Sequence, residues 1–437
     1  MLKNIIKQVW NQRRQNGWIL LELIIAGFFL WTVIDPVYVL TVNHFTPKGY
    51  EEDGRYVLRF GAYGEKHGMR DTTVTKEQQR TAIDNMLRLV RDCPEVESAL
   101  LVQNSSFPNG GSWNGTTYYA DTLKSEERKY VNTQEYTFNN AGGGNLFKTY
   151  GMKNALTGGD IEVPQDAGGR NLIYVSENFA RHMFGTTDAV GKKVYDYRDR
   201  AHEIAAVFKD YKHRDFEPIY PLIIRVNNKV GISPYMQWTY MIAFNLKEGV
   251  DEDAFVERFE REVAPNMAMA NFFFDRLLSF EKQRTTWAKQ SGTYNVIRLK
   301  LALASFALLC IFLGMVGTFW IRCNARRQEI GLMRSLGATK KGITSRFLTE
   351  ATLLITAAFV VSLIILVHYA MQDNMAKFQC TGDMEFMSVN WFMEENPHFL
   401  MVSVITYLAL LVIAWVGTLI PVIRATKVLP ADALRDE

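Results

Sequence analysis

Four stretches of the chain are continuously apolar and long enough to cross a membrane as helices. A helix needs roughly 20 residues to span the ~30 Å hydrocarbon core of a bilayer. The stretches run from about Trp18 to Leu40, Leu301 to Ile321, Ala351 to Ala370 and Phe399 to Ile420. The pattern predicts a membrane protein with four transmembrane helices, the fourth of which begins after Pro397 and ends at Pro421.

Two acidic residues interrupt the first apolar stretch. Glu22 lies one turn inside it, and a charge in hydrocarbon is costly, so such a residue usually faces protein or water. Two interpretations stay open for Glu22: a polar contact within the helix bundle, or an interface residue that reaches the headgroups. Asp35, directly before Pro36, lies near the outer end, where we expect it to reach water.

Basic residues gather on one side of the predicted membrane. Lys and Arg precede the first span and crowd the loop between the second and third, whereas acids dominate the loop between the third and fourth. By the positive-inside rule, the N-terminus, the Arg-rich loop and the C-terminal tail are cytoplasmic. The sequence therefore predicts a multi-pass membrane protein with residues 43–295 outside the cytoplasm.

The external segment is too long for a loop and is expected to form a folded domain. Short runs rich in apolar residues predict strands at 56–60, 97–103, 171–175, 202–208, 222–226 and 241–246. Helical spacing is found at 76–92 and after Asp251. We predict an α+β domain of two lobes, one built from the two ends of the segment and the other from its middle. A charged helix from about Phe272 to Lys300 is expected to form a stalk leading into the second span.

These elements give a predicted order along the chain. It comprises a cytoplasmic segment (1–17), helix one (18–42), the periplasmic domain (43–295, its stalk from about 272), helix two (296–321), a cytoplasmic coupling loop (322–349), helix three (350–371), a short external loop (372–398), helix four (399–421) and a cytoplasmic tail (422–437).

Composition narrows the classes of function. The net charge of +3 gives no basis for nucleic-acid binding. The closest approach to a phosphate-binding loop, Gly185 to Lys192, is followed by Lys193 where Ser or Thr is required. No spacing typical of catalytic, cofactor or metal ligands occurs, so we expect a chain without its own catalytic site.

The cytoplasmic loop predicts a short amphipathic helix. Its apolar residues, among them Ile330, Met333 and Leu336, fill about half the circumference, and Glu329 lies on the same arc. Gly337 is placed to end this helix and Thr339 to begin the next. Such a helix fits a groove on a cytoplasmic partner, and the alternative is a basic helix lying on anionic lipid.

The same loop resembles a known family. The run R-x-E-I-G-x-x-R-S-L-G-A-T, from Arg327 to Thr339, is similar to the coupling segment of MacB/FtsX-type ABC transporter permeases. The tail, with Pro421, Ala425 and Pro430 before Leu434-Arg435, resembles the ending common in that family, and the external stretch 175–210 resembles its periplasmic core. The first span departs from the family pattern.

The resemblance implies a permease subunit of the bacterial inner (cytoplasmic) membrane that moves its external domain when a cytosolic ABC-type ATPase closes. Because the chain has no Walker motif, that ATPase would be a separate polypeptide. ATP and Mg²⁺ would be bound by that partner, and a peptide, lipoprotein or drug-like substrate would be exported or extracted. The residues expected to contact the ATPase are Arg326, Arg327, Glu329, Ile330, Gly331, Met333, Arg334, Leu336 and Gly337. Other expected partners are a second permease subunit (identical or paralogous), membrane lipid and, as an open point, a periplasmic or outer-membrane protein.

Two other functions stay open. One is an FtsX-like regulator that activates a cell-wall hydrolase without transport, and the other is a receptor or scaffold that works without an ATPase.

Overall fold

The computed structural model describes residues 13–64, 67–103, 115–122, 128–140, 144–227, 240–372 and 398–427. The predicted external loop 372–398 lies almost wholly outside these residues, as do the two ends of the chain. The described chain divides into two compact units, a helical unit and an external unit that spans Asn43–Tyr294.

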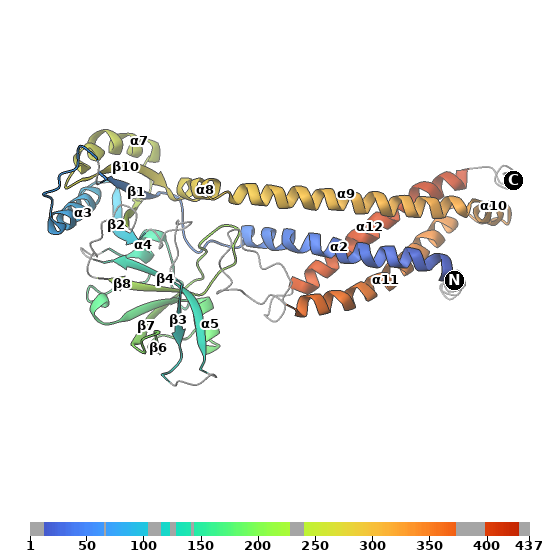
Figure 1. Cartoon of the computed structure of the whole chain (residues 1–437), viewed down its shortest axis with the longest axis horizontal. Coiled ribbons are helices and arrows are strands. Elements are labelled where there is room, and N and C mark those ends of the chain that lie inside the picture. The colour runs from blue at the N-terminus through green and yellow to red at the C-terminus, as the bar shows by residue number, and fades with distance from the viewer. Residues whose placement is uncertain are drawn as a thin grey trace. The chain divides into compact units, whose positions relative to one another are not determined.

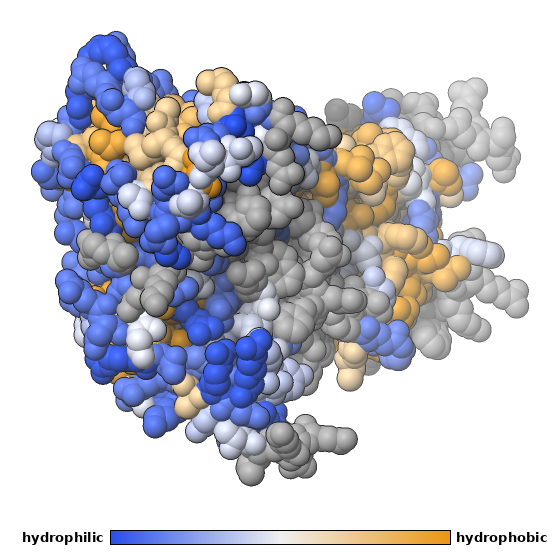
Figure 2. Space-filling view, turned by 60° about the vertical axis from the view of Figure 1, so that its left-hand side comes forward, coloured by the Kyte–Doolittle hydropathy of each residue, from blue (hydrophilic) through white to orange (hydrophobic). Residues whose placement is uncertain are grey.

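Four helices of the helical unit are long and apolar enough to cross a membrane, which confirms the predicted spans. They are α2 (Arg13–Phe45), α9 (Thr293–Ala325), α11 (Lys340–Met371) and α12 (His398–Lys427), and the short α10 (Arg327–Ser335) joins α9 to α11 (Figure 1). Hydrophobic residues dominate the visible surface of these helices, whereas the external unit shows a mostly hydrophilic surface (Figure 2). This contrast is expected when one unit faces lipid and the other faces water.

The four long helices share one apolar core. Leu23 and Leu30 of α2, Phe319 of α9, Leu354 of α11 and Ala414 of α12 are all buried in it. Close approaches occur where small residues meet. A Cβ atom on Gly27 would lie 2.9 Å from Ser362 Oγ of α11, and this hydroxyl donates to the Ile24 carbonyl at 3.0 Å.

Two details of these helices differ from the prediction. Asp35 does not reach water: it is buried, and its Oδ1 lies 2.7 Å from His398 Nε2, because the start of α12 covers it. The fourth helix does not end at Pro421. It continues to Lys427, since a missing N–H inside a membrane helix is tolerated and Val422 is held in a buried cluster.

The described residues of the external unit form ten strands in one sheet, in the order β10-β1-β9-β2-β4-β3-β6-β7-β5-β8. The strands are β1 (Arg55–Ala62), β2 (Val96–Gln103), β3 (Gly115–Tyr119), β4 (Tyr130–Asn139), β5 (Leu172–Ser176), β6 (Lys193–Tyr195), β7 (Ala201–Phe208), β8 (Leu222–Asn227), β9 (Tyr240–Leu246) and β10 (Phe272–Ser279). Its helices are α3 (Lys76–Arg91), α4 (Leu146–Tyr150), α5 (Glu177–Phe184), α7 (Glu252–Arg258) and α8 (Phe280–Gln290), with short turns η2 (Ala167–Gly169), η3 (Phe259–Val263) and η4 (Ala264–Met267).

The strand order confirms the two predicted lobes. Strands β10, β1, β9 and β2 come from the two ends of the segment, and α3 and α7 pack on them through Ile83, Met86 and Phe255. The remaining six strands come from the middle, and parallel pairing of β4 with β8 closes them into a ring that α5 covers through Phe179. Each lobe therefore has its own apolar layer.

The start of the predicted stalk is a strand rather than a helix. Phe272–Ser279 forms β10, which pairs antiparallel with β1 from Tyr56↔Ser279 to Ala62↔Phe272. The helix begins only at Phe280, where the Ser279 hydroxyl accepts the backbone N–H of Lys282 at 3.2 Å. Pairing with a distant strand overrode the local pattern, which has Asp275 and Arg276 exposed side by side.

Candidate functional site

The connection between α9 and α11 is a short helix with a defined end. Gly337 has φ +89°, its N–H bonds to the Arg334 carbonyl at 3.1 Å, and Ala338 N–H bonds to the Met333 carbonyl at 3.0 Å. This pair of bonds is a Schellman motif, which favours glycine because L side chains disfavour positive φ. Thr339 then caps α11, accepting the Gly342 N–H at 3.1 Å. Both predicted boundaries are confirmed.

The apolar face of α10 is used inside the chain. Ile330 is fully buried against Cys323 of α9, Ile343 and Phe347 of α11, and Val422 of α12. Met333 packs against the same cluster. Because these neighbours come from three different helices, α10 is fixed to the ends of the spans rather than free to rotate.

An arginine that binds two carboxylates holds the beginning of α10. Arg326 donates to Glu329 Oε2 at 2.6 Å and to Glu350 Oε2 of α11 at 2.6 Å, and its guanidinium lies 4.6 Å from the centre of the Phe347 ring. Arg322 also donates to Glu350, whose residue is only 3% exposed. Arginine suits this position because its planar fork can serve two carboxylates. We call Arg322, Arg326, Glu329 and Glu350 the loop cluster.

The loop cluster changes how Glu329 is understood. Both of its oxygens already accept from Arg326, at 2.6 and 2.9 Å, and Arg346 lies 3.9 Å away. Its carboxylate is thus occupied within the chain. Any effect of Glu329 on a partner would be indirect, through the placement of α10.

Two leucines form the part of α10 that faces outward. Leu332 is 52% exposed and Leu336 is 79% exposed, and their spacing of four residues puts them on one side of a helix. Gly337 is exposed beside them, whereas Gly331 is buried and Arg334 is half-buried, donating to the Thr426 carbonyl of α12. The side chain of Arg327 lies outside those described. The expected set therefore divides into inward anchors and an outward face.

Sequence reasoning missed three of these residues. Leu332 belongs to the apolar side of the predicted helix, but its exposure is apparent only from the structure, in which the neighbouring helices cover Ile330 instead. Glu350 carried a usable signal, because a single acid in an apolar segment usually has a partner. The role of Arg322 could be recognised only from its ion pair with Glu350.

Glu22 makes a contact within the helix bundle. Thr318 Oγ1 of α9 lies 2.9 Å from both carboxylate oxygens of Glu22. A hydroxyl donor of this kind lowers the cost of a polar group among apolar helices.

A second polar cluster lies in the external unit. We call the loop 209–221, between β7 and β8, the clasp. It contacts the end of α2: Asn43 Nδ2 donates to the Phe216 carbonyl at 3.1 Å, the His44 ring stacks on Phe216 at 5.1 Å, and Lys212 Nζ donates to the Asn43 carbonyl. The clasp therefore holds the residues through which the chain enters this unit.

The clasp also contacts α8, the helix through which the chain leaves this unit. Arg284 of α8 donates to Glu52 Oε1 at 2.8 Å and to Asp215 of the clasp. Burial alone would raise the pKa of Glu52, but hydrogen bonds from Arg284 and Lys48 outweigh it and hold that pKa below its usual value. The Arg284 guanidinium group thus joins α8 both to the segment between α2 and β1, through Glu52, and to the clasp, through Asp215.

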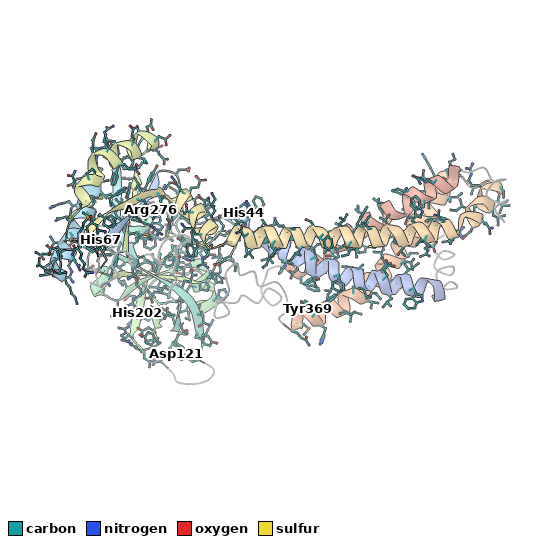
Figure 3. All side chains as sticks on the ribbon, turned by 45° about the horizontal axis from the view of Figure 1, so that its top comes forward. His44, His67, Asp121, His202, Arg276 and Tyr369 are labelled. Atoms are coloured by element: carbon teal, nitrogen blue, oxygen red, sulfur yellow. The ribbon has the colours of Figure 1, made fainter. Side chains whose placement is uncertain are left out.

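Two basic side chains of the clasp, Lys212 and His213, are buried. Burial lowers the pKa of Lys212 to about 8, against the opposing effect of Asp215. Burial lowers the pKa of His213 to about 3, and its Nδ1 is bonded to the Tyr136 hydroxyl. Figure 3 shows that His44, His67 and His202 lie apart from one another on the described chain.

Comparison with known proteins bears on the helical unit. The model of the FtsX-like permease C-terminal family matches residues 301–430, which confirms the predicted resemblance over this part of the chain. Permeases of this family are components of ABC transporters, usually work with a cytosolic ABC-type ATPase and are generally not catalytic themselves. The match and the four apolar helices indicate a bacterial membrane protein.

Two of the solved structures that are similar to the chain are domains outside the cytoplasm of other transporters. The periplasmic region of MacB from Actinobacillus actinomycetemcomitans is 8% identical, with 55% of this chain and 95% of that chain covered and a TM-score of 0.33. The extracellular domain of the noncanonical ABC-type transporter YknZ from Gram-positive bacteria is 10% identical, with coverages of 50% and 100% and a TM-score of 0.29. None of the curated proteins compared with the chain matches it.

Proposed function

We propose that this chain is a permease subunit that couples ATP hydrolysis in a separate cytosolic ABC-type ATPase to movement of its external domain. The partner would bind ATP and Mg²⁺. The movement would export or extract a peptide, lipoprotein or drug-like substrate, and a second permease subunit would complete the assembly.

One observation carries this proposal: α10 is fixed on its inner side and apolar on its outer side. The loop cluster and Ile330 attach α10 to three spans, while Leu332 and Leu336 are exposed. An amphipathic helix that presents apolar side chains at i and i+4 suits a hydrophobic groove on a partner. A push on these leucines would move the ends of α9, α11 and α12 together, because α10 is packed against all of them.

The proposed topology places α10 in the cytoplasm, with both chain ends. The excess of Lys and Arg around α10 supports this side by the positive-inside rule. Residues 43–294 would then lie outside, where the clasp joins the end of α2 to α8. A displacement of the spans would reach the two lobes through these contacts.

The test uses the full chain purified in detergent from its native membrane together with its ATPase. Replacing the outward leucines, in the variant L332D/L336D, should weaken ATPase binding by roughly thirtyfold, because losing one contributing interface residue costs about 1 kcal/mol and two are altered together. Stimulation of ATP hydrolysis by the permease should fall in parallel. L156D alters a similarly exposed leucine, 46% exposed, in the external unit and serves as the matched control.

The outcomes separate the proposal from its alternatives. Unchanged binding and stimulation in L332D/L336D would contradict the role of α10. An active preparation that contains no ATPase would favour the receptor or scaffold. Recovery of a cell-wall hydrolase with the ATPase, and no transported substrate, would favour the FtsX-like regulator.

A further inference from the structure

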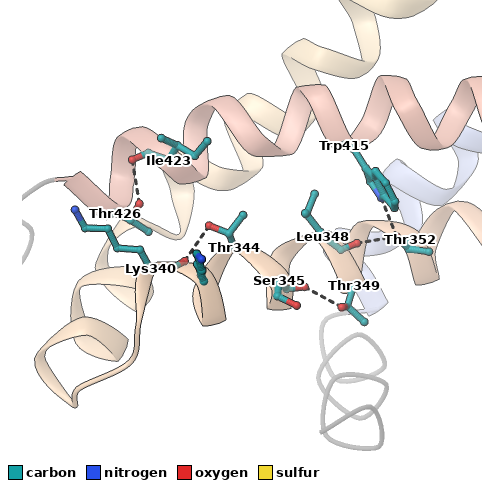
Figure 4. Close-up of a pocket in the computed structure, with 10 residues that line it drawn as sticks. Lys340, Thr344, Ser345, Leu348, Thr349, Thr352, Trp415, Ile423 and Thr426 are labelled. Carbon is teal, nitrogen blue, oxygen red and sulfur yellow. Dashed lines mark hydrogen bonds between the residues drawn. The ribbon is translucent and has the colours of Figure 1, made fainter.

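A groove lies between the beginning of α11 and the end of α12. It has a volume of about 650 Å³, and the residues along it include Lys340, Lys341, Thr344, Leu348, Trp415 and Ile423 (Figure 4). It lies on a different face of α11 from Glu350, a member of the loop cluster, and from Phe347, which packs with Ile330. The coupling role proposed for α10 does not use it.

One end of the groove is positively charged. Lys340 and Lys341 are the first two residues of α11 and are both exposed. Within the described ranges, neither ammonium group has a carboxylate partner, although Arg322, Arg326 and Arg346 nearby all do. The positive end of the helix dipole adds to this charge. An anion would therefore be favoured at this end.

The rest of the groove is apolar. Trp415 and Ile423 are each 43% exposed, and Leu348 lies between them on α11. The Trp415 ring is held in place because Nε1 donates to Thr352 Oγ1 at 3.0 Å. The indole and threonine hydroxyls thus have their hydrogen bonds within the protein, and the wall offers mainly carbon to a ligand.

The threonines along the groove follow the same rule. Thr344 donates to the Lys340 carbonyl at 3.0 Å, Thr349 to the Ser345 carbonyl at 2.8 Å, and Thr352 to the Leu348 carbonyl at 2.8 Å. Their hydroxyl protons are used by the helix backbone. From Lys340 to Thr352 the wall extends about 18 Å along the helix axis, at about 1.5 Å per residue.

We propose that this groove binds one anionic phospholipid. The phosphate lies between the ammonium groups of Lys340 and Lys341, and an acyl chain runs along Leu348, Trp415 and Ile423. A basic pocket between transmembrane helices at the membrane surface suits a lipid headgroup. A soluble phosphate would leave the long apolar wall without a contact, and a neutral lipid would leave the two lysine charges without a counterion.

The binding of phosphatidylglycerol to the full chain in detergent tests this proposal. Native mass spectrometry should show one retained phosphatidylglycerol and weaker retention of phosphatidylcholine with the same acyl chains. The variant K340Q/K341Q should bind phosphatidylglycerol about tenfold more weakly, since each lysine near an anionic headgroup contributes on the order of a fewfold to tenfold in affinity. K192Q/K193Q removes an equally exposed pair of consecutive lysines in the external unit and should leave binding unchanged.

A second variant and a second ligand separate the two ends of the groove. T349W fills the apolar wall but keeps both lysines, and it should reduce lipid retention as much as the charge variant does. Glycerophosphoglycerol, the headgroup without acyl chains, should fail to displace the bound lipid. Unchanged lipid binding in K340Q/K341Q or in T349W would overturn the proposal. Displacement by the headgroup alone would make the groove a simple anion site and would also overturn it.

Discussion

The loop cluster and the ion pairs that join the clasp to α8 are built alike, but their residues lie at very different distances along the chain. In each place an arginine is shared by two carboxylates: Arg326 by Glu329 and Glu350, and Arg284 of α8 by Glu52 and by Asp215 of the clasp. The first arginine lies 3 and 24 positions from its partners, and the second lies 232 and 69 positions from its partners.

The difference in distance determines what each arginine does. Arg326 fixes a short helix to the ends of neighbouring spans, so its effect is local. Arg284 joins residues that are far apart in the sequence. Closing such long loops costs more conformational entropy than forming a local contact does. Loss of Arg284 should therefore affect the whole external unit, and loss of the loop cluster should affect α10 first.

The largest effect is expected from removing Arg284, which joins α8 to the clasp. R284A leaves Glu52 and Asp215 largely buried without their common partner, which costs about 3–5 kcal/mol for a buried ion pair. Denaturant unfolding of the full chain in detergent, followed by fluorescence, measures the change. R276A removes an arginine whose side chain is 50% exposed, and it should cost less than about 0.5 kcal/mol.

A rescue variant sharpens this result. R284L/E52Q/D215N removes the charges together and should recover most of the stability, because a buried ion pair often adds little beyond an apolar replacement. Equal stability of R284A and R276A would show that the clasp does not hold the external unit together.

A smaller and more local effect is expected from E350Q. The amide keeps the shape of Glu350 but loses the charge that Arg322 and Arg326 share, and a hydrogen bond to a charged group is worth about 2 kcal/mol. Hydrogen exchange of the amides of 327–336 should become faster, while exchange in the external strands stays unchanged. E257Q, at a glutamate side chain that is 80% exposed, is the control. Faster exchange in both units would mean that the two clusters are not independent.

The smallest effect is expected from lowering the pH, which should decrease the free energy of unfolding through His213 of the clasp. Burial lowers the pKa of His213 to about 3 in the folded protein, so between pH 6.5 and 3 the unfolded chain binds more protons. The stabilisation is complete above pH 6.5 and is lost as pH falls, by up to about 1.4 kcal/mol per unit. Unfolding of the full chain between pH 6.5 and 5 measures the slope, which H213Q should reduce.

His202 sets a limit on that reduction. Burial also lowers the pKa of His202, so part of the slope should remain in H213Q and should decrease further in H202Q/H213Q. A slope in H213Q equal to that of the unaltered chain would show that the clasp is not the acid-sensitive part.

Features fixed by short-range physics were predictable from the sequence. The hydrocarbon thickness requires spans of a given length, and Gly337 and Thr339 meet backbone requirements within a few residues. The two lobes were also predictable, because short apolar runs bounded by turn residues mark many of their strands. Within the candidate site, the amphipathic nature of α10 followed from residue spacing alone.

Features that depend on distant partners were not predictable. Strand β10 exists because of β1, more than two hundred positions earlier, and β4 hides its alternation because polar residues such as Thr133 and Gln134 are buried in it. Burial of Gln134 and Thr133 depends on the clasp, whose Pro221 carbonyl accepts from the Thr133 hydroxyl at 2.8 Å. For the same reason, the direction in which Glu329 points could not be deduced from the helix period.

The position of strand β10 at the edge of the sheet bears on aggregation of the newly made chain. In the strand order it is a terminal strand, with β1 as its neighbour, so one side of its backbone can pair with another chain and begin aggregation. Asp275 and Arg276, both exposed in its middle, place opposite charges where a second strand would dock. The same two charges that made this segment resemble a helix protect an otherwise phenylalanine-rich strand from edge-to-edge association.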